Sequence, residues 1–187
     1  RLHYVDWGNE DAPPLLLIHG GRDHCRNWDW VAEELRADYH VIAPDLRGHG
    51  DSGWMVGGTY SQAEFTYDIA QLIHQMDLAP LTIIGHSMGS SIGLRYTGLY
   101  PDNVKKIVGI EGLGGAPQRA RHRTDKVTHE RFTTWIEETR ALAARVPHRY
   151  ATFDETLDRM RDANKHLRAD QARHLTMHGI NQNEDGT

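Results

Sequence analysis

The chain has 187 residues, which is long enough for one domain with a sizeable hydrophobic core. Its hydrophobic and charged fractions, 39% and 25%, exclude a disordered or fibrous protein. The net charge of −5 disfavours nucleic acid or an anionic membrane as a partner. Cys25 is the single cysteine, so an internal disulfide is impossible and we expect a cytoplasmic location. The longest apolar run, residues 15–18, is far too short to span a bilayer.

Apolar segments with strand character alternate with helical segments along the first 110 residues. Ser61 and Glu64 have the spacing of a capping box and mark one helix start. Such alternation predicts an α/β fold with a mostly parallel sheet and helices on both faces. In chain order we predict strands at 2–7 and 15–18, a helix at 28–35, a strand at 39–43, a helix at 61–76, a strand at 81–84, a helix at 88–99 and a strand at 104–110.

The sequence changes character after about residue 114. Residues 115–187 contain no strand-like run, and Thr152 with Glu155 forms a second capping-box pattern. We therefore predict two regions, a sheet-containing core at 1–114 and a helical cap or lid at 115–187. The expected helices of the second region are 127–146, 154–166 and 170–178.

The segment Gly85-His86-Ser87-Met88-Gly89 lies between a predicted strand and a predicted helix. Gly-x-Ser-x-Gly in that context is typical of a tight turn that exposes a nucleophilic serine. A serine hydroxyl also needs a base to take its proton and donors for the resulting oxyanion. We propose Ser87 as the nucleophile and the backbone N–H groups of Gly21 and Met88 as the oxyanion hole. Gly21 follows a predicted strand within His19-Gly20-Gly21-Arg22.

Aromatic and imidazole side chains are expected around this serine. The better interpretation of His19 is that it shapes the turn, and a role as catalytic base is disfavoured. An apolar pocket could be lined by aromatic residues from both regions, although each could equally pack in the core. The side chains that we assign to the substrate pocket are His19, Trp28, His86 and Trp135.

Three ordered motifs carry a resemblance to a known family. They are residues 15–21, the run Ala43-Pro44-Asp45-Leu46-Arg47-Gly48-His49-Gly50-Asp51-Ser52, and Gly85–Gly89. With Tyr100-Pro101-Asp102-Asn103-Val104 added, residues 2–112 resemble the cap-bearing branch of the α/β-hydrolase superfamily. The resemblance implies a Ser-His-acid triad, no cofactor, and a small-molecule acyl substrate bound between sheet and cap.

The triad acid and base are less clearly placed than the serine. The resemblance suggests Glu111, at the end of the strand before the cap, as a possible acid. A solvated or cap-pairing glutamate is an equally good interpretation, and Asp45 is expected to stabilise its own loop. The family's histidine follows a last sheet strand that has no counterpart here, so we expect the base to lie outside this chain. His174 and His178 have metal-ligand spacing, but Leu175 replaces the glutamate of H-E-x-x-H, so no metal is expected.

These inferences favour a serine hydrolase that cleaves carboxylic esters. Two alternatives stay open: other chemistry on the same triad, such as C–C bond hydrolysis, lactone hydrolysis or peracid exchange, and a non-catalytic binding member. The abrupt start at Arg1 favours a fragment, while a partner subunit that completes the sheet is the other explanation. The sequence leaves the oligomeric state unknown.

Overall fold

The computed structural model describes residues 1–55, 60–112, 127–143 and 148–183. Its sheet runs in the order β1-β3-β2-β4-β5, with β1 antiparallel to β3 and every other pair parallel. This arrangement confirms the predicted, mostly parallel sheet. The strands are β1 (Tyr4–Asp6), β2 (Pro14–Ile18), β3 (His40–Pro44), β4 (Leu81–His86) and β5 (Val104–Ile110).

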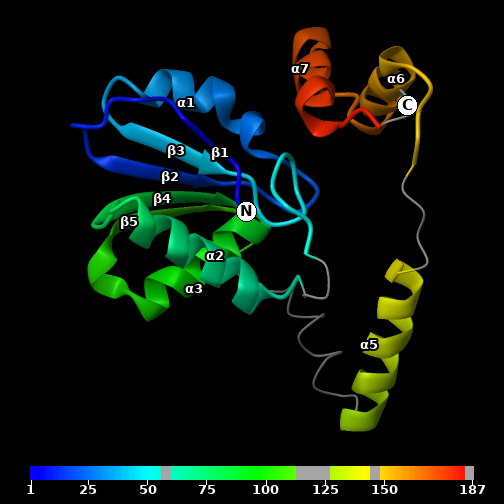
Figure 1. Ribbon diagram of the computed structural model, residues 1–187, viewed down its shortest axis with the longest axis horizontal. Coiled ribbons are helices and arrows are strands. Elements are labelled where there is room, and N and C mark those ends of the chain that lie inside the picture. The colour runs from blue at the N-terminus through cyan, green and yellow to red at the C-terminus, as the bar shows by residue number, and fades with distance from the viewer. Residues whose placement is uncertain (56–59, 113–126, 144–147, 184–187) are drawn as a thin grey trace.

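Helices cover both faces of the sheet, as expected for an α/β fold (Figure 1). The short 3₁₀ helix η1 (Cys25–Trp28) and α1 (Asp29–Leu35) lie on one face. The opposite face carries α2 (Gln62–Gln75) and α3 (Met88–Leu99). A second 3₁₀ turn, η2 (Pro101–Asn103), joins α3 to β5.

The alternation of side chains in β2 explains why the core has two halves. Leu16 and Ile18 are fully buried against α2 and α3. Leu15 and Leu17 point to the other face and pack around η1 and α1. Because successive side chains of a strand face opposite sides, a continuous apolar run is the pattern of a strand covered twice.

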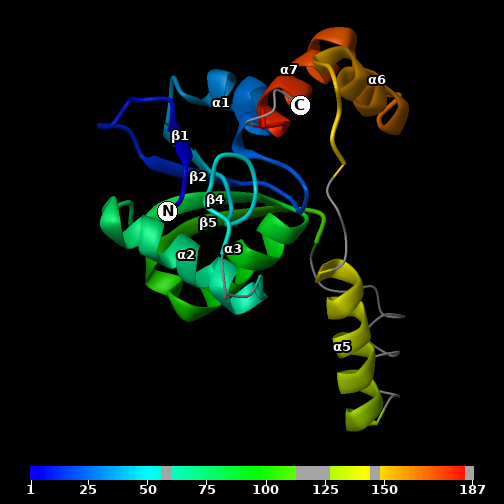
Figure 2. The ribbon, with the colours of Figure 1, turned by 45° about the vertical axis from the view of Figure 1, so that its right-hand side comes forward.

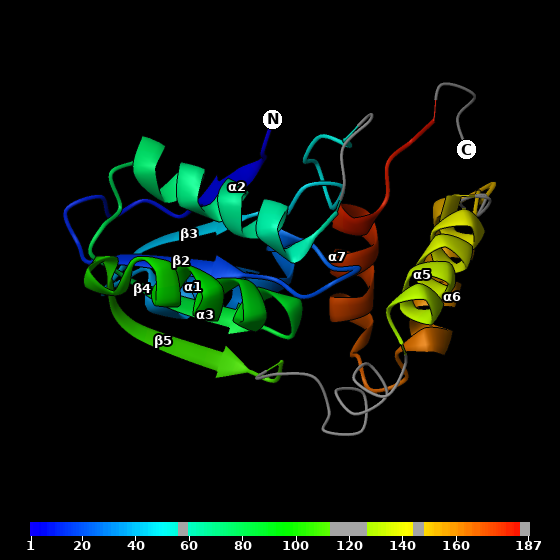
Figure 3. The ribbon, with the colours of Figure 1, turned by 90° about the horizontal axis from the view of Figure 1, so that it is seen from below.

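The second part of the chain contains helices. The described ones are α5 (Thr128–Ala143), α6 (Phe153–Ala163) and α7 (Ala169–Gly179). α6 packs on α7, which also contacts η1, whereas α5 stands apart from the sheet (Figures 2 and 3). The expected helix at 154–166 ends earlier, at Ala163, and parts of our predictions at 115–126 and 144–146 lie outside the described residues. Among the residues that are described, no helix is long and apolar enough to cross a membrane.

Both predicted capping boxes form hydrogen bonds, in two different ways. Ser61 and Glu64 make the complete reciprocal pair at the start of α2. At α6, Thr152 accepts the N–H of Glu155, but the Glu155 carboxylate takes the N–H of Ala151 instead of the Thr152 N–H. Each pair satisfies backbone donors that have no partner within the helix.

Candidate active site

Ser87 occupies a strained turn at the carboxyl edge of the sheet, between β4 and α3. Its backbone has φ +50° and ψ −110°, a region that residues other than glycine rarely adopt. The Ser87 N–H donates to the Ile110 carbonyl at 2.8 Å. Such strain persists only where surrounding structure enforces it, and it often marks a functional residue.

The two glycines that flank Ser87 allow this turn to close. A Cβ atom at Gly85 would lie 2.6 Å from the backbone of Gly89. A Cβ atom at Gly89 would overlap the Ile18 carbonyl oxygen at the end of β2. Glycine is therefore required at both positions, which is the steric reason for the Gly-x-Ser-x-Gly pattern.

The loop that follows β2 lies directly against the turn. A Cβ atom at Gly20 would be 2.8 Å from His86 Nδ1 and 3.4 Å from Ser87 Cβ. At Gly21 it would be 3.9 Å from the Met88 side chain. The structure thus places Gly21 close to Met88, and these are the two residues expected to supply the oxyanion donors.

The buried side chain of His19 forms hydrogen bonds that hold this loop in place. Its Nδ1–H donates to the Gly20 carbonyl at 2.7 Å, and its Nε2 accepts the Leu46 N–H at 2.9 Å. Burial lowers the pKa of His19 to about 4, so the ring is neutral at pH 7. This geometry agrees with a role in shaping the turn. Because the ring has no exposed surface, our assignment of His19 to the substrate pocket is disfavoured.

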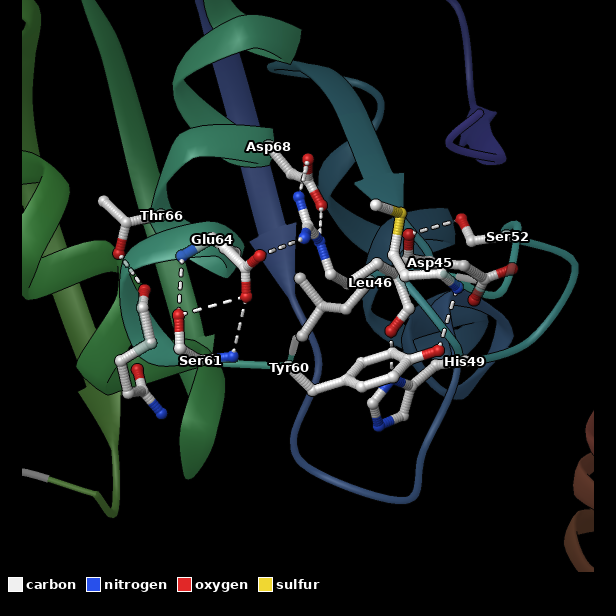
Figure 4. A network of polar contacts seen from close by, with 12 residues as sticks. Asp45, Leu46, His49, Ser52, Tyr60, Ser61, Glu64, Thr66 and Asp68 are labelled. Atoms are coloured by element: carbon white, nitrogen blue, oxygen red, sulfur yellow. Dashed lines mark hydrogen bonds and ion pairs between the residues drawn. The ribbon is translucent and has the colours of Figure 1, made fainter. Parts of the chain in front are cut away.

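Asp45 has both carboxylate oxygens engaged in the loop after β3. Oδ1 accepts the Cys25 N–H at 2.7 Å, while Oδ2 accepts the Asp51 N–H at 3.0 Å and the His3 Nδ1–H at 2.7 Å. Burial would raise the pKa of Asp45, but these hydrogen bonds hold it below the ordinary value. Ser52 Oγ also donates to the Asp45 carbonyl, and Figure 4 shows Ser52 beside Asp45. The contacts match the expectation that Asp45 stabilises this loop.

Arg47 ties the same loop to α2. Its guanidinium donates to both carboxylate oxygens of Asp68, at 2.6 and 2.7 Å, and lies 3.3 Å from Glu64. Asp68 and Glu64 face the loop from the first turns of α2 (Figure 4). The hydrogen bonds to Asp68 raise the pKa of Arg47 above its usual value. Arg47 therefore holds the loop after β3 against α2.

Glu111 lies beside the turn, and none of the histidines described in the second region is paired with it. It follows β5 with φ +62°, and its carboxylate is 4.0 Å from His86 Nε2. The Glu111 side chain is 78% exposed and that of His86 39% exposed. His86 is accessible beside Ser87, as a pocket residue would be. Within the described ranges, none of the hydrogen bonds made by histidine rings is to Ser87.

The two tryptophans assigned to the pocket differ in their surroundings. Trp28 is 7% exposed and packs in the core with Trp7 and Leu17, which disfavours its assignment to the pocket. The sequence could not separate these roles, because a buried tryptophan suits a core as well as a pocket. Trp135 is 59% exposed on α5 and packs edge-on against Phe132. Its role in the pocket stays a prediction.

A large cavity lies between the loop after β3 and the second region. It has a volume of about 1070 Å³, which is the size of a site for a small molecule. Trp54, which is largely exposed, contributes to its wall, and Ser87 does not line it. The other lining residues are His148, Arg149, Tyr150, Ala151, Thr152, Phe153, Thr156, Gly179, Ile180, Asn181, Gln182 and Asn183.

A separate polar cluster, which sequence reasoning missed, forms where α7 meets α1. It contains Asp29, His174 and His178. The i,i+4 spacing of the histidines was visible in the sequence, but nothing there indicated that Asp29 lies beside them.

Comparison with known proteins supports the same fold. A family model described as the alpha/beta hydrolase fold matches residues 13–178. A serine hydrolase-like protein of Danio rerio is 26% identical over 183 residues, covering 96% of this chain and 55% of the relative. A probable serine hydrolase of Drosophila melanogaster is 26% identical over 161 residues, covering 84% of this chain and 47% of the relative. The chain thus spans about half the length of these relatives.

Solved structures of hydrolases are also similar to this chain. The thioesterase domain from the curacin biosynthetic pathway is 26% identical with a TM-score of 0.81, covering 99% of this chain and 66% of that one. An esterase of Mycobacterium tuberculosis is 25% identical with a TM-score of 0.77, covering 99% and 59%. The match of the family model over most of the chain, together with the Ser87 turn, shows that the protein belongs to the α/β-hydrolase fold family.

Proposed function

We propose that the whole protein is a serine hydrolase of carboxylic esters, with Ser87 as its nucleophile. The observation that carries this proposal is the strained backbone of Ser87 at the carboxyl edge of a parallel sheet, with the Gly20–Gly21 loop against it. The names of two relatives, a serine hydrolase-like protein and an esterase, support the same class of reaction.

In this proposal Ser87 Oγ attacks the ester carbonyl carbon while a histidine outside the chain takes its proton. The N–H groups of Gly21 and Met88 stabilise the negative charge that develops on the carbonyl oxygen. The C–O bond to the alcohol then breaks, and the alcohol leaves with the proton held by the histidine. Water, activated by the same histidine, hydrolyses the acyl-enzyme and regenerates Ser87.

Glu111 is the acid that we propose to orient this histidine. Glu111 directly precedes Gly112, which lies against the Ser87 carbonyl. Its carboxylate is exposed and therefore accessible to the imidazole ring of a histidine outside the described residues. Its contact with His86 favours the competing role of a simple surface ion pair. Replacement of Glu111 by glutamine in the full-length protein separates the two, because only a triad acid lowers kcat by orders of magnitude.

We propose that residues 115–187 form a cap over the site. The cavity between Trp54 and residues 148–183 supports this division, since it lies between the sheet-containing core and the second region. Ser87 does not line this cavity, so the cavity supports the division into core and cap and does not locate the acyl group of the substrate. A cytoplasmic location remains a prediction from the single cysteine.

Labelling of the full-length protein with a fluorophosphonate tests the nucleophile. The probe should label the wild type and fail to label Ser87→Ala. Ser91→Ala is the matched control: its hydroxyl, one turn along α3, already donates to the Gly112 carbonyl at 2.8 Å, so labelling should persist. If the folded wild-type protein is not labelled, it is not a serine hydrolase and the non-catalytic alternative replaces the proposal.

Hydrolysis of p-nitrophenyl esters of increasing chain length tests the substrate class. The proposal predicts turnover that depends on acyl length and disappears in Ser87→Ala. Labelling by the fluorophosphonate without turnover of any ester would indicate other chemistry on the same serine.

A further inference from the structure

Three potential metal ligands from distant parts of the sequence meet where α7 contacts the start of α1. Asp29 is the first residue of α1, and His174 and His178 are one turn apart on α7. His174 Nε2 is 3.0 Å from Asp29 Oδ2, and the two imidazole rings are 4.6 Å apart between centroids. One nitrogen or oxygen atom from each residue lies within 4.8 Å of the others. Figure 2 shows α7 beside α1 in this region.

The chemistry of the three side chains fits a divalent transition metal. Two imidazoles with one carboxylate is a donor set that Zn²⁺ accepts, with the fourth position left for water. Magnesium and calcium prefer oxygen donors throughout, so the two nitrogens argue against them.

The surroundings leave both a free donor atom and a route for the ion. Asp29 Oδ1 is buried and has no hydrogen-bond partner among the described residues, although the side chain as a whole is 14% exposed. A buried oxygen without a partner is costly, and a cation would satisfy it. Asp29 and His174 also line a surface cavity of about 550 Å³, through which an ion can enter.

One neighbouring charge competes with such an ion. The Arg26 guanidinium lies 2.8 Å from Asp29 Oδ2, and its side chain is one-third exposed. His174 Nε2 is also 3.2 Å from the Arg26 carbonyl. A metal would therefore displace the ion pair between Arg26 and Asp29, and His174 Nε2 would leave the Arg26 carbonyl to bind the metal.

We propose that Asp29, His174 and His178 form a binding site for a divalent transition metal, with Zn²⁺ as the best fit, that links α7 to α1. The site involves neither Ser87 nor the loop against it, so it does not depend on the proposed hydrolase activity. Binding holds the second region of the chain against the core through side chains from both.

Zinc titration of the full-length protein by calorimetry, after removal of metals with a chelator, tests this site. The wild type should bind one Zn²⁺, and His178→Ala should weaken binding by at least about 10-fold. His166→Ala is the matched control, because His166 is an exposed histidine of the same region that lies outside the cluster, and its affinity should equal that of the wild type. Titration with Co²⁺ should give the visible absorption of a low-coordinate nitrogen and oxygen site, and His178→Ala should lose it.

A second variant guards against loss of binding through misfolding. Arg26→Gln removes the competing cation, so zinc binding should become about 2- to 5-fold tighter, which an unfolded protein would not show. Absence of saturable zinc binding by the wild type would overturn the proposal. The same conclusion would follow if the double variant His174→Ala/His178→Ala bound zinc as well as the wild type.

Discussion

Replacement of Asp45 by asparagine should destabilise the protein without changing the shape of the side chain. Asp45 is 1% exposed, and its carboxylate accepts hydrogen bonds from the Cys25 and Asp51 N–H groups and from His3. An asparagine keeps one acceptor oxygen and presents an NH₂ group in place of the other. Whichever way the amide turns, at least one backbone N–H, that of Cys25 or of Asp51, then faces a donor.

The expected cost is about 1.5–3 kcal/mol at pH 7, the range for losing a hydrogen bond to a charged group and leaving its partner buried. The cost depends on pH with a definite sign. Because the folded pKa of Asp45 lies below the unfolded value of about 3.9, the carboxylate stabilises the protein above about pH 4. This contribution is lost as the pH falls through the folded pKa. The gap between wild type and Asp45→Asn should therefore close in acid.

Urea unfolding of the full-length protein at a series of pH values measures both effects. Asp51→Asn is the control, because Asp51 lies in the same loop with an exposed side chain and contributes only its backbone N–H to Asp45. Its free energy of unfolding should match the wild type within about 0.5 kcal/mol. A loss of less than about 0.5 kcal/mol in Asp45→Asn, or a gap that widens in acid, would refute the reasoning.

Three further predictions concern the turn at Ser87 and the loop after β3. Gly89→Ala should lower the free energy of unfolding by more than about 3 kcal/mol, because its Cβ would overlap the Ile18 carbonyl. Gly98→Ala, in open space on the same helix, should instead raise the free energy of unfolding by about 0.5–1 kcal/mol. Thermal melts of both variants test this pair of predictions. Ser87→Gly should be about 1–3 kcal/mol more stable than Ser87→Ala, because only glycine relieves the positive φ, and equal urea midpoints would contradict it. Arg47→Lys should cost about 1–2 kcal/mol through loss of the paired contact with Asp68, as urea unfolding will measure.

The sheet, its flanking helices and the place of Ser87 were predictable because local patterns carry them. The apolar run in β2 indicated a strand buried on both faces, and the Gly-x-Ser-x-Gly spacing between β4 and α3 indicated a tight turn. The helix start at Ser61 followed from its capping partner three residues on. Each of these signals depends on residues close together in the chain.

The sequence was less informative where a role depends on contacts distant in sequence. Trp28 follows the loop near the serine, but η1 turns its ring into the core beneath β2. The contact between Asp29 and His174 depends on how α7 docks on α1, for which the sequence carries no local sign. The contacts of His19 with the Leu46 N–H and of Asp45 with the Cys25 N–H were not readable either, because each joins residues at least 20 positions apart.

The conformation of Ser87 is itself a long-range property, although its motif is local. Gly85 and Gly89 permit the turn, but the strands on either side of β4, β2 and β5, enforce it. The end of β2 closes over Gly89, the Ile110 carbonyl of β5 accepts the Ser87 N–H, and a Cβ atom at Gly112 would overlap the Ser87 carbonyl. Since these strands are parallel, their carboxyl ends meet at one edge, where a strained residue can be held from several sides. The pentapeptide therefore marks the site, while the sheet holds its serine in place.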